Sequence, residues 1–283
     1  KLTSNHVFET LRIQNDIRVC VRFFIWSVCR NVYECTSGHA CCRKFMRVCD
    51  LLIRRVGKKR QFDEFWLVLK GMRKKSVPIP SEAFTVLIKS YGQASMVFEA
   101  LQTFEKMSDF NCNPSLATFN AALEIACKAN LLKDAEKIYQ GILSANLRPD
   151  KISMNAFLFG LGRGGKLQEA RNYLKKCEEM LFFADKISYT SLISGLCKAG
   201  HMNEAHHALK DMEKAGIFPD IVTYSALMDG LCKAGQLEKS MALFSKLKSK
   251  GCIANVFTYS ILIDGLCKDL KIDEAYRLFN EML

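Results

Sequence analysis

The chain has 283 residues, of which 49% are hydrophobic and 25% charged, with only five prolines, a composition that argues against extensive disorder. Forty-one basic residues against twenty-nine acidic ones give a formal charge of +12. This charge favours a polyanionic partner such as nucleic acid, with an anionic membrane surface as the rival. No apolar run reaches the roughly 18 residues that a spanning helix needs, which argues against membrane insertion.

The first 45 residues keep only part of the pattern found later. The apolar spacing over residues 7–12 and 17–26 predicts a helical hairpin, whereas residues 33–42 match no pattern. We therefore predict an irregular helical cap over residues 1–45, since the end of an array has to cover an apolar face. Four metal-ligating residues lie in this cap: Cys35, His39, Cys41 and Cys42. Because they lack a Cys-x-x-Cys pair, zinc is the weaker interpretation, and we predict free thiols and no metal site.

After the cap, a short stretch recurs every thirty-five residues. It reads Tyr-Thr-Ser-Leu-Ile-Ser-Gly-Leu-Cys-Lys-Ala-Gly from Tyr189 and returns, with few changes, from Tyr224 and from Tyr259. With Tyr189 at the fourth position, the units are 46–80, 81–115, 116–150, 151–185, 186–220 and 221–255, followed by a partial unit at 256–283. The register needs no insertion or deletion. It predicts a stacked array whose units bury a continuous core between neighbours.

Each unit carries the pattern of two amphipathic helices. Apolar residues recur at three- and four-residue spacing, first from Tyr224 and again from Leu237. Gly165, Gly200 and Gly235 stand where the first helix must stop, because glycine accepts a left-handed conformation there. Pro-Asp pairs at residues 149–150 and 219–220 close two of the units and pass the chain to the next one. The predicted fold class is all-α, a right-handed α-solenoid of stacked antiparallel helix pairs.

The thirteen cysteines do not suggest disulfides. One repeat position is shared by four of them: Cys127, Cys197, Cys232 and Cys267. Such recurrence indicates a small buried apolar residue chosen for packing, and therefore a reducing compartment. The chain starts at Lys1 and ends inside a repeat at Leu283, so we interpret it as a fragment. The absence of a targeting peptide from such a fragment proves nothing about the whole protein.

The period, the stretch from Tyr189 and the closing Pro219-Asp220 together resemble pentatricopeptide repeat proteins of the P-type class. The resemblance covers residues 46–283 and is fullest over residues 186–283. It is weakest over residues 46–80, where Cys49 and Asp50 replace the usual aromatic and small polar residues, so this degenerate unit is not expected to bind a base. The tetratricopeptide repeat, a relative with a thirty-four residue period, has a Trp-containing signature that does not recur here.

The resemblance implies that each repeat presents one RNA base to two side chains, at its fifth and last positions. The pairs are Thr85 with Ser115, Asn120 with Asp150, Asn155 with Asp185, Thr190 with Asp220, and Ser225 with Asn255, followed by Ser260, whose partner lies beyond the chain. By the family's pairing rules, the four pairs from Asn120 to Asn255 read U-U-G-A in the 5′ to 3′ direction. The flanking bases stay open, with a purine expected after the A. The alternative is that Asn and Ser near a helix start are only caps.

Two further positions have implied roles. A wedge between neighbouring bases is implied for the second position, occupied by Ala117, Ile152, Ile187, Val222 and Phe257; ordinary packing between units is the alternative. A cation recurs near the end of successive first helices, at Lys128, Arg163, Lys198, Lys233 and Lys268. Such a stripe suits a phosphate backbone, and solvated surface charge is the alternative.

Catalysis is not supported by the sequence. It has neither a His-x-Glu followed by Cys-x-x-Cys, as a deaminase requires, nor a nuclease-like aspartate cluster outside the repeats. We expect a monomer without cofactor that binds single-stranded organellar RNA and acts in RNA processing, stability or translation. The mitochondrion is the first choice and the chloroplast the second. The competing hypothesis is a protein-binding scaffold of the helical-repeat type, such as a ribosome-associated subunit.

Overall fold

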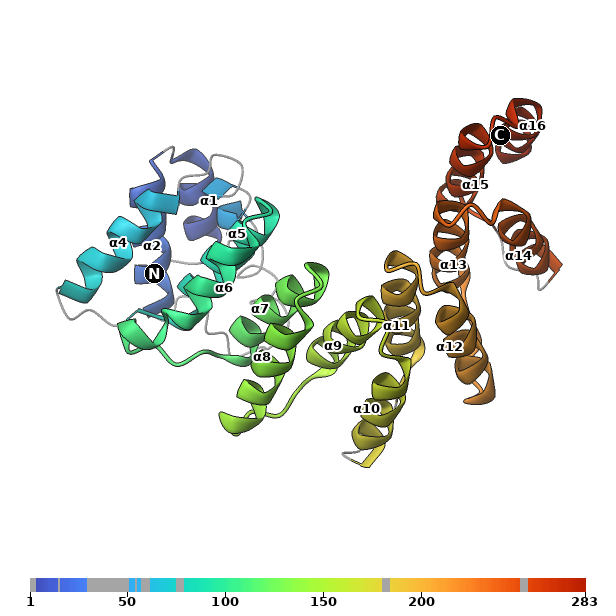
Figure 1. Cartoon of the computed structure of the whole chain (residues 1–283). Helices are drawn as coiled ribbons and strands as arrows, with labels where there is room; N and C mark the ends of the chain where they lie inside the picture. Colours follow the sequence, from blue (N-terminus) through green and yellow to red (C-terminus); the bar gives the residue numbers. More distant parts are fainter. Residues whose placement is uncertain are drawn as a thin grey trace. The chain divides into compact units, whose positions relative to one another are not determined.

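The structure is a computed structural model that describes residues 4–14, 16–29, 51–53, 55–56, 62–74, 79–179, 184–249 and 254–283. The irregular segment 33–42, the four metal-ligating residues of the cap, and Cys49 and Asp50 lie outside these ranges. Every regular element within them is helical (Figure 1). The all-α prediction is therefore confirmed.

The helices follow the chain in pairs. They are α1 (Ser4–Ile13), α2 (Ile17–Cys29), α4 (Phe62–Lys74), α5 (Ser81–Gln93), α6 (Val97–Glu105), the 3-10 helix η1 (Ser108–Phe110), α7 (Leu116–Lys128), α8 (Leu132–Ser144), α9 (Lys151–Arg163), α10 (Leu167–Glu179), α11 (Lys186–Lys198), α12 (Met202–Lys214), α13 (Ile221–Lys233), α14 (Leu237–Ser249), α15 (Val256–Lys268) and α16 (Ile272–Met282). No helix in the described part of the chain combines the length and apolarity needed to cross a bilayer.

The helix starts and turns follow the repeat. From α5 onward, each first helix of a pair begins at the first position of a unit. Gly165, Gly200 and Gly235 follow first helices with φ values of +69°, +81° and +69°, the left-handed conformation predicted for them. Ser95 and Asn130 take the same conformation at the same position, so the turn is retained where glycine is not present.

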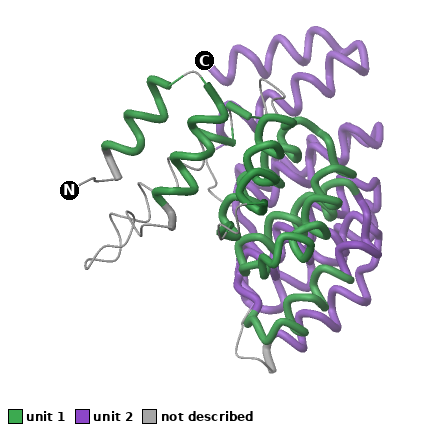
Figure 2. The backbone as a smooth tube through the Cα atoms, turned by 90° about the vertical axis from the view of Figure 1, so that its left-hand side faces the viewer, with its two compact units in different colours: residues 1–129, 137–148 green, residues 130–136, 149–283 purple. Residues whose placement is uncertain are grey.

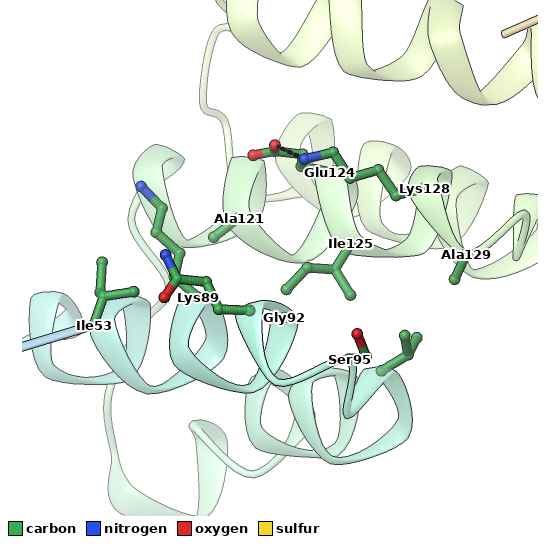
Figure 3. A pocket seen from close by; sticks show the side chains of 11 residues that line it. Ile53, Lys89, Gly92, Ser95, Ala121, Glu124, Ile125, Lys128 and Ala129 are labelled. Carbon is green, nitrogen blue, oxygen red and sulfur yellow. Dashed lines mark hydrogen bonds and ion pairs between the residues drawn. The ribbon is translucent and has the colours of Figure 1, made fainter. Parts of the chain in front are cut away.

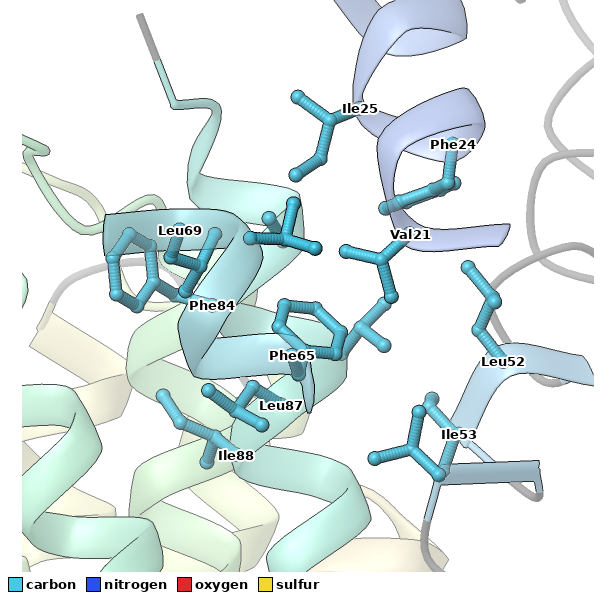
Figure 4. Packing of buried hydrophobic residues seen from close by; sticks show 14 of the residues in the cluster. Val21, Phe24, Ile25, Leu52, Ile53, Phe65, Leu69, Phe84, Leu87 and Ile88 are labelled. Carbon is cyan, nitrogen blue, oxygen red and sulfur yellow. The ribbon is translucent and has the colours of Figure 1, made fainter. Parts of the chain in front are cut away.

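The chain divides into two compact units, which we describe separately (Figure 2). Unit 1 comprises residues 1–129 and 137–148, and unit 2 comprises residues 130–136 and 149–283. In unit 1, α1 and α2 form a helical pair and α2 packs on α4. The buried core includes Val21, Phe24, Phe65, Phe84 and Leu87 (Figure 4). This core joins the N-terminal helices to the first full repeat.

In unit 2, the first helices stack on one another through small residues. A Cβ atom on Gly195 of α11 would lie 2.3 Å from the Phe159 carbonyl oxygen of α9, and one on Gly162 would lie 2.5 Å from the Leu192 carbonyl oxygen. One pair further along, a Cβ on Gly230 would meet the Cβ of Cys197 at 2.8 Å. The glycine and cysteine positions of the repeat therefore let neighbouring first helices approach closely.

The repeat-position cysteines are free thiols of graded exposure. Cys127 and Cys197 are buried, Cys232 is half-buried and Cys267 is exposed. Burial, followed by the negative charge of Asp229, raises the pKa of the Cys197 thiol to about 12. This agrees with the packing role predicted for Cys127 and Cys197, because a buried thiol in apolar surroundings is inert. The exposed Cys267 does not have the burial predicted for this position.

Candidate functional site

The last position of each 35-residue repeat is also the N-cap of the first helix of the following repeat. Four such residues accept a hydrogen bond from the backbone N–H three residues later: Asp150 from Ser153 at 2.8 Å, Asp185 from Ser188 at 3.0 Å, Asp220 from Thr223 at 3.1 Å and Asn255 from Thr258 at 3.0 Å. A cap of this kind typically contributes about 0.5–2 kcal/mol. The capping role considered for the fifth-position Asn and Ser therefore belongs to the last position.

The fifth and last positions of a unit are connected by a hydroxyl from the next unit. Thr190 Oγ1 lies 2.7 Å from Thr223 Oγ1, which lies 3.1 Å from Asp220 Oδ1. Thr223 stands at the third position of its unit. The structure thus brings Thr190 and Asp220, predicted to act as a pair, to one shared hydroxyl group.

Three more pairs show the same bridge. Ser188 lies 2.9 Å from Asn155 and 3.1 Å from Asp185. Thr258 lies 3.3 Å from Ser225 and 2.9 Å from Asn255. Thr118 lies 2.8 Å from Thr85 and 2.9 Å from Ser115. Sequence reasoning missed this third position. Its signal is visible in the sequence, as a Ser or Thr at 118, 153, 188, 223 and 258.

Three predicted base-reading residues are placed differently, of which Ser225, like Asn120, is buried. Asn120 is buried in unit 1, whereas Asp150 caps α9 in unit 2, so their pairing stays a prediction. Ser260 is exposed and its hydroxyl donates to the Val256 carbonyl oxygen at 2.7 Å.

A lysine at the first position accompanies two of the last-position aspartates. Lys151 Nζ lies 2.9 Å from Asp185 Oδ2, and Lys186 Nζ lies 3.6 Å from Asp220 Oδ2. Burial alone raises the pKa of the Asp185 carboxyl. Hydrogen bonds from Lys151 and Ser188, together with the Lys151 charge, outweigh burial and hold that pKa below its ordinary value. Asp185 is therefore an ionised acceptor at neutral pH.

The second-position side chains stand exposed beside these polar pairs. The exposed fractions are 63% for Ile152, 61% for Ile187, 59% for Val222 and 64% for Phe257, and Ala117 is exposed as well. The next two residues of α13, Thr223 and Tyr224, are completely buried. The second position is thus free to contact a ligand, and the alternative of packing between units finds little support in this exposure.

The cation stripe is less uniform than the sequence indicates. Three of its lysines form ion pairs with an acid one turn earlier: Lys128 with Glu124 at 2.5 Å, Lys233 with Asp229 at 2.6 Å and Lys268 with Asp264 at 2.6 Å. Arg163 Nη1 donates to the Lys198 carbonyl oxygen at 3.4 Å, and Lys198 lies over the Phe159 ring. Exposed ion pairs contribute only about 0–1 kcal/mol, so a phosphate group can compete for these lysines.

Unit 1 contains a pocket of about 550 Å³ at the ends of α5 and α7 (Figure 3). Its polar lining includes Lys89, Ser95, Glu124 and Lys128, and its apolar lining includes Ile125. The pocket therefore includes one of the predicted phosphate-contacting lysines. Among the described residues, no group of three or more His, Cys, Asp or Glu side chains is arranged to hold a metal ion.

Comparisons with known families identify the repeat. A model of the PPR repeat family matches residues 184–233 and 219–268, and a model of the PPR repeat matches residues 82–112, 152–180 and 257–283. The chain belongs to the pentatricopeptide repeat family. The resemblance found in the sequence is thereby confirmed, and the matches include the helices that carry the bridging residues Ser188, Thr223 and Thr258.

Pentatricopeptide repeat proteins with curated sequences show similarity over part of the chain. The mitochondrial pentatricopeptide repeat-containing protein At1g77360 of Arabidopsis thaliana is 29% identical over 127 residues, which are 45% of this chain and 23% of that protein. The small ribosomal subunit protein mL103 (rPPR7) of the same plant is 31% identical over 129 residues, 45% of this chain and 29% of that protein. The chain thus matches less than a third of the length of either relative.

Among solved structures, the pentatricopeptide repeat protein PPR10 of maize, in complex with an 18-nt psaJ RNA element, is similar over 99% of this chain and 43% of PPR10. The TM-score is 0.56 and the sequence identity 19%. This similarity shows that the two proteins share the helical-repeat fold.

Proposed function

We propose that the chain binds single-stranded RNA along its first helices, with one base for each repeat. The observation that carries the proposal is the recurrent association of a polar fifth residue, a hydroxyl bridge and a polar last residue beside an exposed apolar second residue. A base needs hydrogen-bonding groups at its edge and flat apolar contact on its face. The repeat supplies both at a constant interval. Maize PPR10, which has the same fold, has been solved with bound RNA.

The preferred core sequence is U-U-G-A. Asn120 with Asp150 and Asn155 with Asp185 would each read U, Thr190 with Asp220 would read G, and Ser225 with Asn255 would read A. The bases opposite Thr85 with Ser115 and opposite Ser260 are left open. The exposed lysines at the ends of α7, α11, α13 and α15 would approach the phosphates, with no base preference.

The activity is binding rather than catalysis, by a monomer without cofactor. An organellar setting, with the mitochondrion favoured over the chloroplast, agrees with the mitochondrial relatives. There, occupancy of a transcript would serve processing, stability or translation. A second candidate function is a ribosome-associated scaffold, favoured by the similarity to the ribosomal proteins mL103 and mL102.

A binding titration distinguishes the two candidates. Fluorescently labelled RNA containing U-U-G-A and a scrambled RNA of equal composition are each titrated with the full chain at two salt concentrations. We expect tighter binding of the U-U-G-A RNA and a loss of affinity at higher salt, because bound phosphates release counterions. Absence of binding to both RNAs at low salt would leave the scaffold as the better reading.

A substitution tests the assignment of bases to residues. Thr190→Asn gives unit 186–220 the same pair as unit 151–185, so preference at the third base should move from G toward U, by a free energy of about 1–3 kcal/mol. The RNAs differ only at that base. An unchanged preference would refute the residue assignment and leave sequence-independent binding in place.

A further inference from the structure

The base-reading scheme gives no role to the third-position hydroxyl, yet this group lies between the two members of the pairs described above. Thr118, Thr223 and Thr258 are completely buried at the starts of α7, α13 and α15. A buried hydroxyl has to satisfy its hydrogen-bonding capacity within the protein. The direction of its hydrogen bonds therefore constrains its neighbours.

In repeat 186–220 the direction of the hydrogen bonds follows from the single proton that each threonine hydroxyl can donate. Thr223 contacts the Asp220 carboxylate at 3.1 Å and the Thr190 hydroxyl at 2.7 Å. An ionised carboxylate only accepts, and a threonine hydroxyl has a single proton. Both contacts are satisfied only when Thr223 donates to Asp220 and accepts from Thr190. The Thr190 proton is then directed into the protein, and Thr190 can only accept from a base.

In unit 81–115 the direction is reversed. The Thr85 hydroxyl donates to the Ser81 carbonyl oxygen of its own helix at 3.0 Å, so its 2.8 Å contact with Thr118 makes Thr118 the donor. Thr118 in turn lies 2.9 Å from the Ser115 hydroxyl and accepts from it. The bridge in this unit therefore runs opposite to the Asp220 bridge, because the Ser81 carbonyl oxygen, and not the last residue, takes the proton of Thr85.

Unit 221–255 has a third arrangement. Thr258 donates to Asn255 Oδ1 at 2.9 Å, and Ser225, 3.3 Å from Thr258, donates to it. Ser225 is therefore an acceptor toward a base, as Thr190 is, but the Asn255 amide group adds an N–H donor that Asp220 lacks. Guanine offers only donors at its N1 and amino groups, whereas adenine offers an amino donor and an N1 acceptor. The two arrangements match these two edges.

We infer that the third-position hydroxyl of one repeat is a positioning residue that sets the hydrogen-bond polarity of the base-reading side chain in the preceding repeat. Where the last residue is Asp220 or Asn255, the bridging hydroxyl donates to it and accepts the proton of the fifth residue, which leaves the fifth residue an acceptor toward the base. The inference rests on the proposed function, and it adds Thr223 and Thr258 to the residues that determine specificity.

The test is Thr223→Val, which removes the hydroxyl, keeps the side-chain shape and leaves the backbone N–H that Asp220 caps. Without the bridge, the Thr190 proton is free to turn outward and donate to adenine N1. The affinities of wild type and variant for U-U-G-A and U-U-A-A RNA are measured by fluorescence anisotropy at one salt concentration. We expect the preference for G over A at the third base to fall about tenfold, the equivalent of one lost discriminating contact.

Two further variants test whether a change in base preference comes from the bridging hydroxyl. Thr223→Ser restores a hydroxyl and should restore the preference for G. Thr258→Val should by the same reasoning free the Ser225 proton to donate to adenine N1, and so strengthen the preference for A over G at the fourth base while leaving the third base unaffected. It provides an independent test if Thr223→Val does not fold. Circular dichroism and thermal melting confirm the folded state of each variant.

The outcomes separate this inference from the proposed function. If the wild-type chain shows no preference for U-U-G-A, the proposed function fails and the inference fails with it. If wild type prefers G and Thr223→Val keeps that preference, the hydroxyl does not set polarity. An equal loss of affinity for all RNAs would assign Thr223 a purely structural role and also contradict the inference.

Discussion

Lys151 and Asp185, the first and last residues of one repeat, form an ion pair in which Lys151 Nζ lies 2.9 Å from Asp185 Oδ2. The pair is separated by thirty-four positions in sequence, and it holds the carboxylate that also caps α11 through Ser188. One aspartate is thus a helix cap, an ion-pair partner and a member of a predicted base-reading pair.

We expect Lys151→Ala to destabilise the protein at neutral pH by about 0.2–1 kcal/mol, since the Lys151 side chain is largely exposed and the Asp185 side chain partly so. The pKa of Asp185 is lowered in the folded state. Its contribution is therefore present above the unfolded pKa and is lost as the pH falls through the folded pKa. The difference between wild type and variant in urea unfolding should disappear in acid. Lys175→Ala, at an exposed site on α10, is the control and should show no such pH dependence.

Gly195→Ala should destabilise the protein by about 1–3 kcal/mol or more, because the new methyl group meets backbone atoms that cannot rotate away. The nearest is the Phe159 carbonyl oxygen at 2.3 Å. Gly71 in α4 has no atom within 4 Å of an added Cβ, so Gly71→Ala should instead stabilise by about 0.5–1 kcal/mol. Chemical denaturation measures both. A tolerated Gly195→Ala would contradict the close approach of α9 and α11.

The repeat-position cysteines should react in order of exposure. Cys267 is exposed, whereas Cys197 is buried and its pKa of about 12 leaves almost no thiolate at neutral pH. Brief alkylation of the native protein with iodoacetamide, followed by peptide mass spectrometry, should label Cys267 and spare Cys197. The same treatment in denaturant should label both. Early labelling of Cys197 in the native protein would show that its packing is less tight than described.

Phe257→Ala should weaken binding of U-U-G-A RNA without loss of stability, because the ring is 64% exposed and base stacking on an aromatic ring contributes about 1–3 kcal/mol. Phe218→Ala is the matched control. Phe218 is 79% exposed but lies in the connection before α13, away from the second position. Equal effects of the two variants in the anisotropy titration would show that Phe257 has no stacking role.

Much of the fold could be read from the sequence, because the features that determine it are local or periodic. The thirty-five residue period located the first helices, since amphipathic spacing and the left-handed glycines at 165, 200 and 235 act within a few residues. The same period aligned the fifth, last and second positions. Alignment alone did not show that Asp220 is a helix cap, or that Phe257 is exposed while Tyr224 is buried.

The hydroxyl bridges were decided by tertiary structure. Thr190 and Thr223 lie thirty-three residues apart. Their contact depends on how α11 packs on α13, at the distance that Gly230 and Cys197 allow. The ion pairs of Lys151 and Lys233 also depend on side-chain geometry. The sequence by itself determined a repeating helical array with a polar pair in each repeat. Only the packed helices decided which hydroxyl joins each pair, because a hydrogen bond requires a distance and a direction that periodicity does not specify.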